Sequence, residues 1–293
     1  MQLYGKRGVS VIQKATKDML SQLIALWSEC FGDSEEYSSF FFQNKMIGTE
    51  VFENEYVYIV DGKVVSMLSI LPAAIIEEKK TRPFWYIYAV ATKKEYRKNG
   101  YAGKLLGFIL EKAVKENTAV GLVPANDALF KYYRKFGFET YFYHRILQFE
   151  RNRIQEKKKR EMSTKPIAHQ DYAKLRNRRY QAEGVVVWDE DSVAYALKEN
   201  KSLNGDAYEI LYEGKTYFAV FCKSGEELLV RETDVPECLL QTVFCRIAEK
   251  EQCSKIRVIY FPNISNQEKN EEHGMIFNEN SDAKIGYLGL ALD

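Results

Sequence analysis

The segment Lys93-Lys94-Glu95-Tyr96-Arg97-Lys98-Asn99-Gly100-Tyr101-Ala102-Gly103-Lys104 decides the fold of this chain. It follows an aromatic apolar run at residues 84–90. It leads into a stretch in which apolar side chains recur at i, i+3 and i+4, as on one face of a helix: Ala102, Leu105, Leu106, Ile109, Leu110 and Ala113. The spacing predicts a strand, a basic turn, and a helix that starts near Gly100.

This turn has the chemistry of an anion-binding site. The first N–H groups of a helix have no partner within the helix, and the positive end of the helix dipole lies beside them. Near that point the sequence places one acidic residue, Glu95, among five cationic residues: Lys93, Lys94, Arg97, Lys98 and Lys104. We therefore expect the turn to bind a pyrophosphate.

Two motifs resemble those of the GNAT superfamily of N-acetyltransferases. Residues 97–102 match the pattern Arg/Gln-x-x-Gly-x-Gly/Ala, with which that superfamily cradles the pyrophosphate of coenzyme A. Residues 122–138 resemble its next element, in which a strand is followed by an Asn that opens a helix and by a Tyr four residues before Gly137-Phe138. The alternative for the first motif alone is a solvated basic turn that caps a core helix. The resemblance covers nearly all of residues 9–149, with Lys94 standing where relatives usually carry proline.

The resemblance implies a set of site residues. Acetyl-CoA, as co-substrate, would be held by the strand end, the turn, and Asn126 on the pantetheine arm; the strand and turn residues are Val90, Ala91, Thr92, Arg97, Lys98, Asn99, Gly100, Tyr101, Ala102 and Gly103. The backbone N–H near Val90 would polarise the thioester carbonyl. Tyr133 would be the general acid that assists the leaving thiolate. Tyr132 is the alternative by a one-residue slip, and plain packing of Tyr133 is the structural alternative.

The general base and the acceptor stay open. An alkylamine with a pKa near 10.4 is neutral only about once in 2,500 at pH 7, so a base or a water relay must take its proton. No acidic residue lies on residues 84–92, where many relatives place a Glu, and a water chain ordered by Tyr86 and Tyr88 is our preferred substitute. Aromatic residues expected near the acceptor are Trp27, Phe31, Tyr37, Phe40, Phe41 and Trp85. Aminoglycosides, polyamines, amino-acid derivatives and protein lysines all fit this pattern.

Composition narrows the class of protein. The 293 residues allow two domains, and a formal net charge of +1 does not favour a general nucleic-acid or anionic-membrane binder. No apolar leader and no run of membrane-spanning length is present, so we expect a cytoplasmic protein. Five cysteines without a Cys-x-x-Cys pair, and three histidines, predict no metal site and reduced thiols.

The order of elements predicts an α/β (α+β) fold of two tandem GNAT-like domains, each a mixed twisted sheet flanked by helices. Residues 1–150 form the acetyl-CoA-binding domain, with strands at 9–13, 56–60, 64–71, 84–91, 118–123 and 139–148 and helices from Thr16 and at 35–44. Residues 151–163 are charge-dense and predict a solvated linker or exposed helix. Residues 164–293 repeat the order, with helices at 170–182, 192–198 and 236–250 and strands at 208–212, 217–222, 228–232, 256–261 and 285–292.

The second domain is predicted to lack a cofactor site. Its strand–helix turn is short and acidic and has no glycine, and Asp234 with Glu237 reads as a capping box that occupies the helix N–H groups. A pyrophosphate would meet Glu232, Asp234 and Glu237 there. We expect this domain to wall the substrate cleft or to make a subunit contact in a homo-oligomer. The tandem plan resembles the bacterial enhanced-intracellular-survival-type acetyltransferases without their C-terminal sterol-carrier-like domain.

These patterns favour an acetyl-CoA-dependent N-acetyltransferase that acts on a primary amine. A non-catalytic acyl-CoA-binding regulatory protein is the first alternative. A mycothiol-synthase-like or aminoacyl transferase on the same fold is the second.

Overall fold

The computed structural model describes residues 10–45, 51–151, 161–264, 266–278 and 285–290. The chain divides into two compact units, residues 1–71 with 85–122, and residues 72–84 with 123–293. These ranges differ from the predicted domains 1–150 and 164–293, which stay a prediction.

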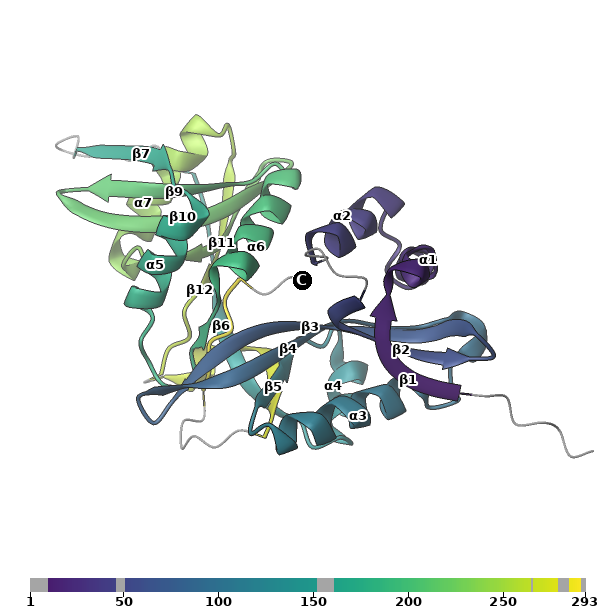
Figure 1. Cartoon of the computed structure of the whole chain (residues 1–293). Helices are drawn as coiled ribbons and strands as arrows, with labels where there is room; N and C mark the ends of the chain where they lie inside the picture. Colours follow the sequence, from purple (N-terminus) through teal and green to yellow (C-terminus); the bar gives the residue numbers. More distant parts are fainter. Residues whose placement is uncertain (1–9, 46–50, 152–160, 265, 279–284, 291–293) are drawn as a thin grey trace, which may run out of the picture. The chain divides into compact units, whose positions relative to one another are not determined.

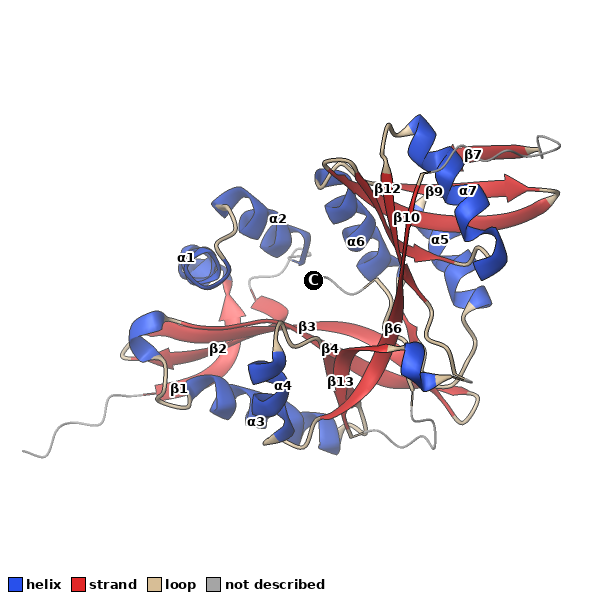
Figure 2. Ribbon diagram, turned by 180° about the vertical axis from the view of Figure 1, so that it is seen from behind, coloured by secondary structure: helices blue, strands red, loops and turns tan. Residues whose placement is uncertain are grey.

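The first unit is a sheet covered by helices on both faces (Figure 1). Its strands follow the order β1-β2-β3-β4-β5. Helices α1 and α2 lie on one face of the sheet and α3 on the other, in agreement with both views (Figures 1 and 2). The elements are β1 (Ser10–Thr16), α1 (Leu20–Phe31), α2 (Glu35–Lys45), β2 (Val51–Val60), β3 (Lys63–Glu77), β4 (Lys80–Thr92), α3 (Tyr101–Lys115) and β5 (Ala119–Leu122).

Local sequence signals account for most of these elements. Asp61 and Gly62 both have positive φ, the conformation of a two-residue hairpin turn, and they join β2 to β3. The predicted helix after the basic turn is confirmed as α3, which buries Leu105, Leu106, Ile109, Leu110 and Ala113. The predicted capping of the first helix by Thr16 is wrong, because a short 3₁₀ turn, Lys17–Met19, precedes α1 and the Thr16 hydroxyl bonds to the Asp18 carboxylate instead.

The second unit is a larger mixed sheet in the order β13-β6-β12-β11-β10-β9-β7 (Figure 2). Its helix α7 packs on one face through an extensive apolar core. On the other face Tyr172 of α5 contacts Phe218 of β10. The elements are α4 (Asp127–Arg134), β6 (Glu139–Glu150), β7 (Met162–Pro166), α5 (His169–Arg179), β8 (Val186–Val187), α6 (Glu190–Ser202), β9 (Asp206–Tyr212), β10 (Lys215–Ser224), β11 (Glu227–Thr233), α7 (Glu237–Lys250), β12 (Lys255–Tyr260) and β13 (Glu271–Phe277).

Strand β6 explains why residues 123–150 group with the second unit. Residues 139–144 pair with β13, and residues 145–150 pair with β12, both antiparallel. The segment predicted to close the first domain is therefore an interior strand of the second unit's sheet.

Two predictions for the second half need correction. The strand predicted at 285–292 is wrong for the described residues 285–290, which make only single bridges, Phe142 with Gly286 and Val185 with Tyr287. The added strand is β13, whose polar first residues hid it in the sequence. Of the predicted linker 151–163, Met162 and Ser163 belong to β7, and residues 152–160 lie outside the described residues.

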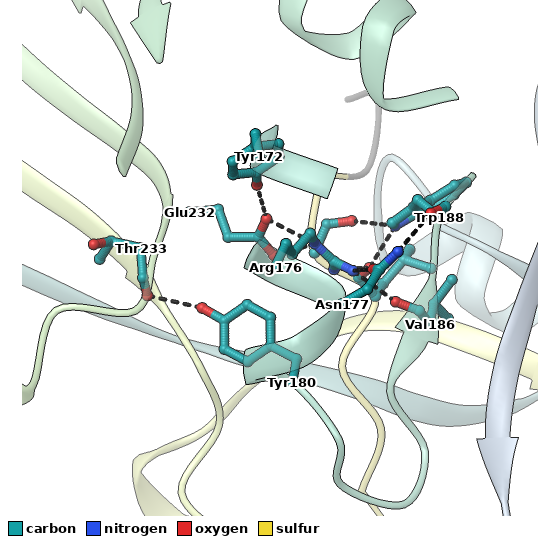
Figure 3. Close-up of polar contacts among 10 residues, drawn as sticks. Tyr172, Arg176, Asn177, Tyr180, Val186, Trp188, Glu232 and Thr233 are labelled. Carbon is teal, nitrogen blue, oxygen red and sulfur yellow. Dashed lines mark hydrogen bonds and ion pairs between the residues drawn. The ribbon is translucent and has the colours of Figure 1, made fainter. Parts of the chain in front are cut away.

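A buried ion pair fixes the centre of the second unit (Figure 3). Arg176 and Glu232 are both fully buried, and Arg176 Nε donates to Glu232 Oε2 at 2.9 Å. The Tyr172 hydroxyl donates to the same carboxylate, and Arg176 Nη1 donates to the Val186 carbonyl at 2.9 Å. Trp188 Nε1 donates to the carbonyl of Leu288 at 2.9 Å, which fastens residues 285–290 to this centre.

We expect Glu232→Ala to cost about 3–5 kcal/mol of unfolding free energy, because it leaves the Arg176 guanidinium buried without a counter-charge. Urea denaturation followed by tryptophan fluorescence measures this. The matched control is Glu227→Ala on the same strand, whose pair with Arg257 is partly exposed and should contribute less than about 1 kcal/mol. Equal losses in the two variants would contradict the assignment.

Candidate functional site

The turn between β4 and α3 leaves a helix N-terminus open. After Thr92 the chain makes one 3₁₀ turn, Lys94–Tyr96, and then Lys98 and Gly100 adopt left-handed φ values of 66° and 78°. Gly100 is the N-cap of α3, so no side chain caps this helix. A Cβ added at Gly100 would meet nothing within 4 Å, so the space beside it is open. Glycine is favoured here by the backbone conformation.

Side chains of the turn hold its shape. Arg97 Nε donates to the Thr92 carbonyl at 3.1 Å, and its Nη2 lies 3.5 Å from the Cys30 sulfur. Asn99 Nδ2 donates to the Tyr96 carbonyl at 3.0 Å. Arg97 and Asn99 thus support the loop with their side chains, and the first backbone N–H groups of α3 are the donors offered to a ligand.

Lysines supply the positive charge around this turn. The Lys98 and Lys104 side chains are exposed, and the Lys104 ammonium lies 5.6 Å from the centre of the Tyr101 ring and 5.8 Å from that of Tyr58. The Lys94 backbone N–H is already taken by Glu29 Oε1 at 2.6 Å. An uncapped helix start with exposed cations beside it matches what a pyrophosphate requires.

The end of β4 is irregular where a carbonyl-polarising N–H was predicted. Ala89 has a φ of +52°, which a non-glycine residue rarely adopts inside a strand and which disturbs the ladder just before Val90. Val90 and Thr92 are half-buried, whereas Ala91 is buried and its carbonyl accepts from Ser66 Oγ at 2.7 Å. The predicted residues Val90, Ala91 and Thr92 thus lie with the turn in the first unit.

The other two predicted site residues belong to the second unit. Asn126 is the N-cap of α4, and its Oδ1 accepts from the Leu129 N–H at 3.1 Å. Its Nδ2 is therefore the group it would offer to a ligand.

Tyr133 is more deeply buried than Tyr132, and its protonated hydroxyl can donate a hydrogen bond. Tyr133 is 7% exposed, and no described group forms a hydrogen bond with its hydroxyl, which is free to donate elsewhere. Burial, reinforced by the neighbouring Tyr132, raises the pKa of Tyr133 far above its usual value, so the hydroxyl keeps its proton. Tyr132 is half-buried, and burial raises its pKa as well.

The aromatic residues expected at the acceptor side divide into two groups. Trp27, Tyr37 and Phe41 form a ring cluster with Tyr88 on the α1 and α2 face of the sheet, where Trp27 and Phe41 are buried core residues. Trp85 lies on the other face, because the Lys112 ammonium of α3 is 4.6 Å from its ring. Trp85 therefore does not share a face with Trp27, Tyr37 and Phe41.

Two tyrosine hydroxyls occupy backbone carbonyls beyond the paired part of the parallel strands β11 and β12 in the second unit. The pairing of β11 with β12 ends at Val230 and Val258. The Tyr260 hydroxyl donates to the Val235 carbonyl, and the Tyr180 hydroxyl donates to the Thr233 carbonyl, each at 2.8 Å. A cavity of about 420 Å³ remains beside them, lined by Tyr180, Thr233, Tyr260, Arg145, Arg179, Gln181, Ala182, Asp234, Phe261 and Pro262.

The predicted capping box at this position is wrong. The helix starts at Glu237 with Pro236 as its N-cap, so Asp234 lies too far back to cap it. Asp234 Oδ1 instead accepts from the Phe218 N–H at 2.6 Å, and Arg179 Nε lies 3.0 Å from Oδ2. Burial raises the pKa of Asp234 to about 6. Glu232, predicted to face the same opening, is instead the buried partner of Arg176.

Comparison with known proteins relates part of this chain to a known domain family. The family model of the acetyltransferase (GNAT) domain matches residues 11–141, a little under half of the chain. These residues are therefore similar to a GNAT acetyltransferase domain. The match spans the uncapped turn and also Asn126 and Tyr133. No curated protein sequence matches the chain significantly.

Solved structures share the fold of nearly the whole chain. A probable N-acyltransferase from Enterococcus faecalis superposes with a TM-score of 0.71 at 16% identity, covering 92% of this chain and 72% of the other. A GCN5-related N-acetyltransferase from Anabaena variabilis gives 0.70 at 19% identity, with 92% and 72% covered. Eis1 from Mycobacterium abscessus gives 0.66 at 9% identity, with 91% and 73% covered. The mixed α/β fold is thereby confirmed.

Two features are absent from the described residues. No cluster of three or more His, Cys, Asp or Glu side chains that could hold a metal ion occurs there. Within the same part of the chain, no helix is both long and apolar enough to cross a membrane.

We expect Gly100→Glu to abolish acetyl-CoA binding, because it sets a carboxylate beside the open helix N-terminus. The matched control is Gly100→Ala, which shares the strain of a side chain at a φ of +78° but adds no charge and should still bind. Isothermal calorimetry on both variants measures the difference. Unchanged affinity in Gly100→Glu would refute the site.

Proposed function

We propose that this chain is an acetyl-CoA-dependent N-acetyltransferase that moves the acetyl group to a primary amine by direct attack on the thioester. The observation that carries the proposal is the uncapped N-terminus of α3 behind the left-handed Gly100, flanked by exposed lysines, within a matched GNAT domain. The backbone N–H groups of Tyr101, Ala102 and Gly103 and the cations around them suit the pyrophosphate of acetyl-CoA, the co-substrate.

The leaving group needs modest help. A thiol with a pKa near 8.5 can depart as a thiolate when one hydrogen bond reaches the sulfur. We assign that hydrogen bond to the Tyr133 hydroxyl, which is protonated, buried and without a partner among the described residues. The Val90 N–H, next to the irregular Ala89, is assigned to the thioester carbonyl. Asn126 Nδ2 is assigned to the pantetheine arm.

The second half has a supporting role in this proposal. The hydroxyls of Tyr260 and Tyr180 already occupy the carbonyls of Val235 and Thr233 at the opening between β11 and β12, where a pantetheine arm would have to bind. We therefore assign acetyl-CoA binding to residues 1–150 and a non-catalytic, wall-forming role to residues 164–293.

A non-catalytic acyl-CoA-binding protein is the competing function, favoured by the lack of an acidic side chain along residues 84–92. Release of free thiol from acetyl-CoA in the presence of a panel of amines separates the two. The panel includes a polyamine, an aminoglycoside, an amino-acid ester and a lysine peptide. Thiol-directed or aminoacyl transfer would appear as a different acceptor.

We expect Tyr133→Phe to lower turnover by roughly 10²–10⁴ with little change in acetyl-CoA affinity, since only the hydroxyl is removed. Steady-state kinetics and calorimetry test the two parts separately. Tyr132→Phe is the matched control because it removes the neighbouring hydroxyl. Full activity in Tyr133→Phe, together with loss of activity in Tyr132→Phe, would show that Tyr132 and not Tyr133 assists the leaving thiolate.

We expect the full-length chain to bind one acetyl-CoA per chain, because the second opening is filled by its own tyrosines. Calorimetric stoichiometry measures this, with Gly100→Glu as the control in which binding should vanish. A stoichiometry of two, or saturable binding that persists in Gly100→Glu, would show that the second half binds cofactor.

A further inference from the structure

Strand β2 carries a buried carboxyl group with half of its hydrogen-bonding capacity unused. Glu55 is 4% exposed, and its register partner on β3 is Ser69. The Ser69 hydroxyl donates to Glu55 Oε2. Oε1 of Glu55 has no hydrogen-bond partner within the described parts of the chain.

This carboxyl group lies on the sheet face that α1 and α2 cover. The neighbouring Tyr56 points to the α3 face, because its ring lies 6.1 Å from that of Phe108 on α3. Successive side chains alternate along a strand, so Glu55 points the opposite way. Tyr88 of β4 lies on the same face as Glu55, with its ring 5.8 Å from Trp27 of α1.

Glu55 on β2 and Ser69 on β3 are cross-strand neighbours, and the irregular part of β4 lies next to Ser69 on the following strand. Strands β3 and β4 are joined by the tight turn Glu78-Lys79, so they run antiparallel. The Lys93 N–H donates to the Val65 carbonyl at 3.0 Å, and Ser66 Oγ donates to the Ala91 carbonyl. Ser66 Oγ also lies 2.9 Å from Thr92 Oγ1, so Val65 stands opposite Lys93 and Ser66 opposite Thr92. Counting four residues along each strand from Val65 and Lys93 places Ser69 opposite the irregular Ala89, next to Tyr88. Since strands lie about 4.8 Å apart, these neighbours lead from β4 to Glu55 in two steps.

Among the described residues, no charge offsets the burial of Glu55. Desolvation raises the pKa of Glu55 well above its usual value, opposed only by the Ser69 hydrogen bond. The acidic groups around α1 are engaged elsewhere, Glu29 with the Lys94 N–H and Asp33 with the Trp27 indole at 2.8 Å. Glu35 and Glu36 lie in the first turn of α2, and Lys14 of β1 pairs with the exposed Glu53. None of these charges contributes to the shift in the pKa of Glu55.

We propose that Glu55 is the terminal acceptor of the proton that the acceptor amine must lose, and that the Ser69 hydroxyl passes this proton to it. The inference rests on the proposed N-acetyltransferase function and supplies the base that residues 84–92 lack. A buried carboxyl group without a cation costs stability, and such groups concentrate at sites where a proton is moved.

The proton balance is simple. The ammonium gives one proton to Ser69 Oγ as the Ser69 hydroxyl proton moves to Glu55 Oε2. The neutral amine then forms a bond to the thioester carbon and the carbon–sulfur bond breaks. The acylated nitrogen releases its second proton to the leaving sulfur, which accepts a hydrogen bond from Tyr133 and departs as the thiol. Glu55 returns its proton to water before the next cycle. Because a carboxylate with a raised pKa is a stronger base, the environment of Glu55 suits this task.

The first test compares Glu55→Gln with wild type in the full-length chain. We expect turnover with a strongly basic alkylamine to fall by about 10²-fold or more, with acetyl-CoA affinity unchanged. The loss should shrink with a weakly basic amine that is already neutral at the assay pH. Wild-type activity should rise with pH through the ionisation of Glu55, and Glu55→Gln should lack that limb. Ser69→Ala should reproduce the loss in part.

The matched control is Glu53→Gln, two residues away on β2 with an exposed side chain, which should keep wild-type rate and pH profile. Equal turnover in Glu55→Gln and wild type would overturn the proton route while leaving the transferase function intact. An equal loss with both amines would also overturn it and leave Glu55 a structural residue. If wild type binds acetyl-CoA but acetylates no amine, the proposed function falls, and this inference falls with it.

A stability measurement tests the buried ionisation without catalysis. Since the folded-state pKa of Glu55 is raised, wild-type stability should be highest below the usual Glu pKa and should be lost as pH rises through the folded-state value. The free energy of unfolding of Glu55→Gln, measured relative to that of wild type, should therefore be higher at pH 8 than at pH 4. Denaturant midpoints at the two pH values measure this. If this relative stability is the same at both pH values, Glu55 ionises in the folded protein without a desolvation penalty.

Discussion

The helix N-terminus behind Gly100 is the constraint around which the first unit is organised. Free N–H groups at the start of a helix need water, a side chain or a ligand as partner. Here Gly100 supplies no side chain, and the Arg97 and Asn99 side chains donate hydrogen bonds to the Thr92 and Tyr96 carbonyls near the loop. The loop is therefore held by its own side-chain hydrogen bonds, while the first N–H groups of α3 are left to bind an anion.

In the second unit the backbone groups beyond the paired strands are already bonded. Tyrosine hydroxyls donate to the carbonyls that follow the paired part of β11 and β12, and the Asp234 carboxylate accepts from a backbone N–H of β10. A closed hydrogen-bond network of this kind favours rigidity over ligand binding. The two halves thus differ less in their order of elements than in whether backbone groups at the strand ends are left for a partner.

Local signals predicted the elements well and the long-range contacts poorly. The Asp61-Gly62 turn, the start of α3 and the helix opened by Asn126 are encoded within a few residues, and all were predictable. Asp234 misled because its spacing to Glu237 fits a capping box, whereas Pro236 delays the helix and a strand N–H 16 residues away takes the carboxylate. The pairing of β6 with both β12 and β13 could not be predicted either, because it joins segments more than 100 residues apart.

Glu55 was missed for the same reason, since its character depends on a partner across the sheet and on burial that one strand alone does not reveal. Its contrast with Glu232 is instructive. Both carboxyl groups are buried and both accept from a hydroxyl, but Glu232 also has the Arg176 guanidinium and so stays a fixed anion. Among the described residues Glu55 has no cation beside it, so nothing fixes it in the ionised form and burial raises its pKa. A carboxylate that must hold a fold together needs a permanent counter-charge, and one that must take up and release a proton is better without it.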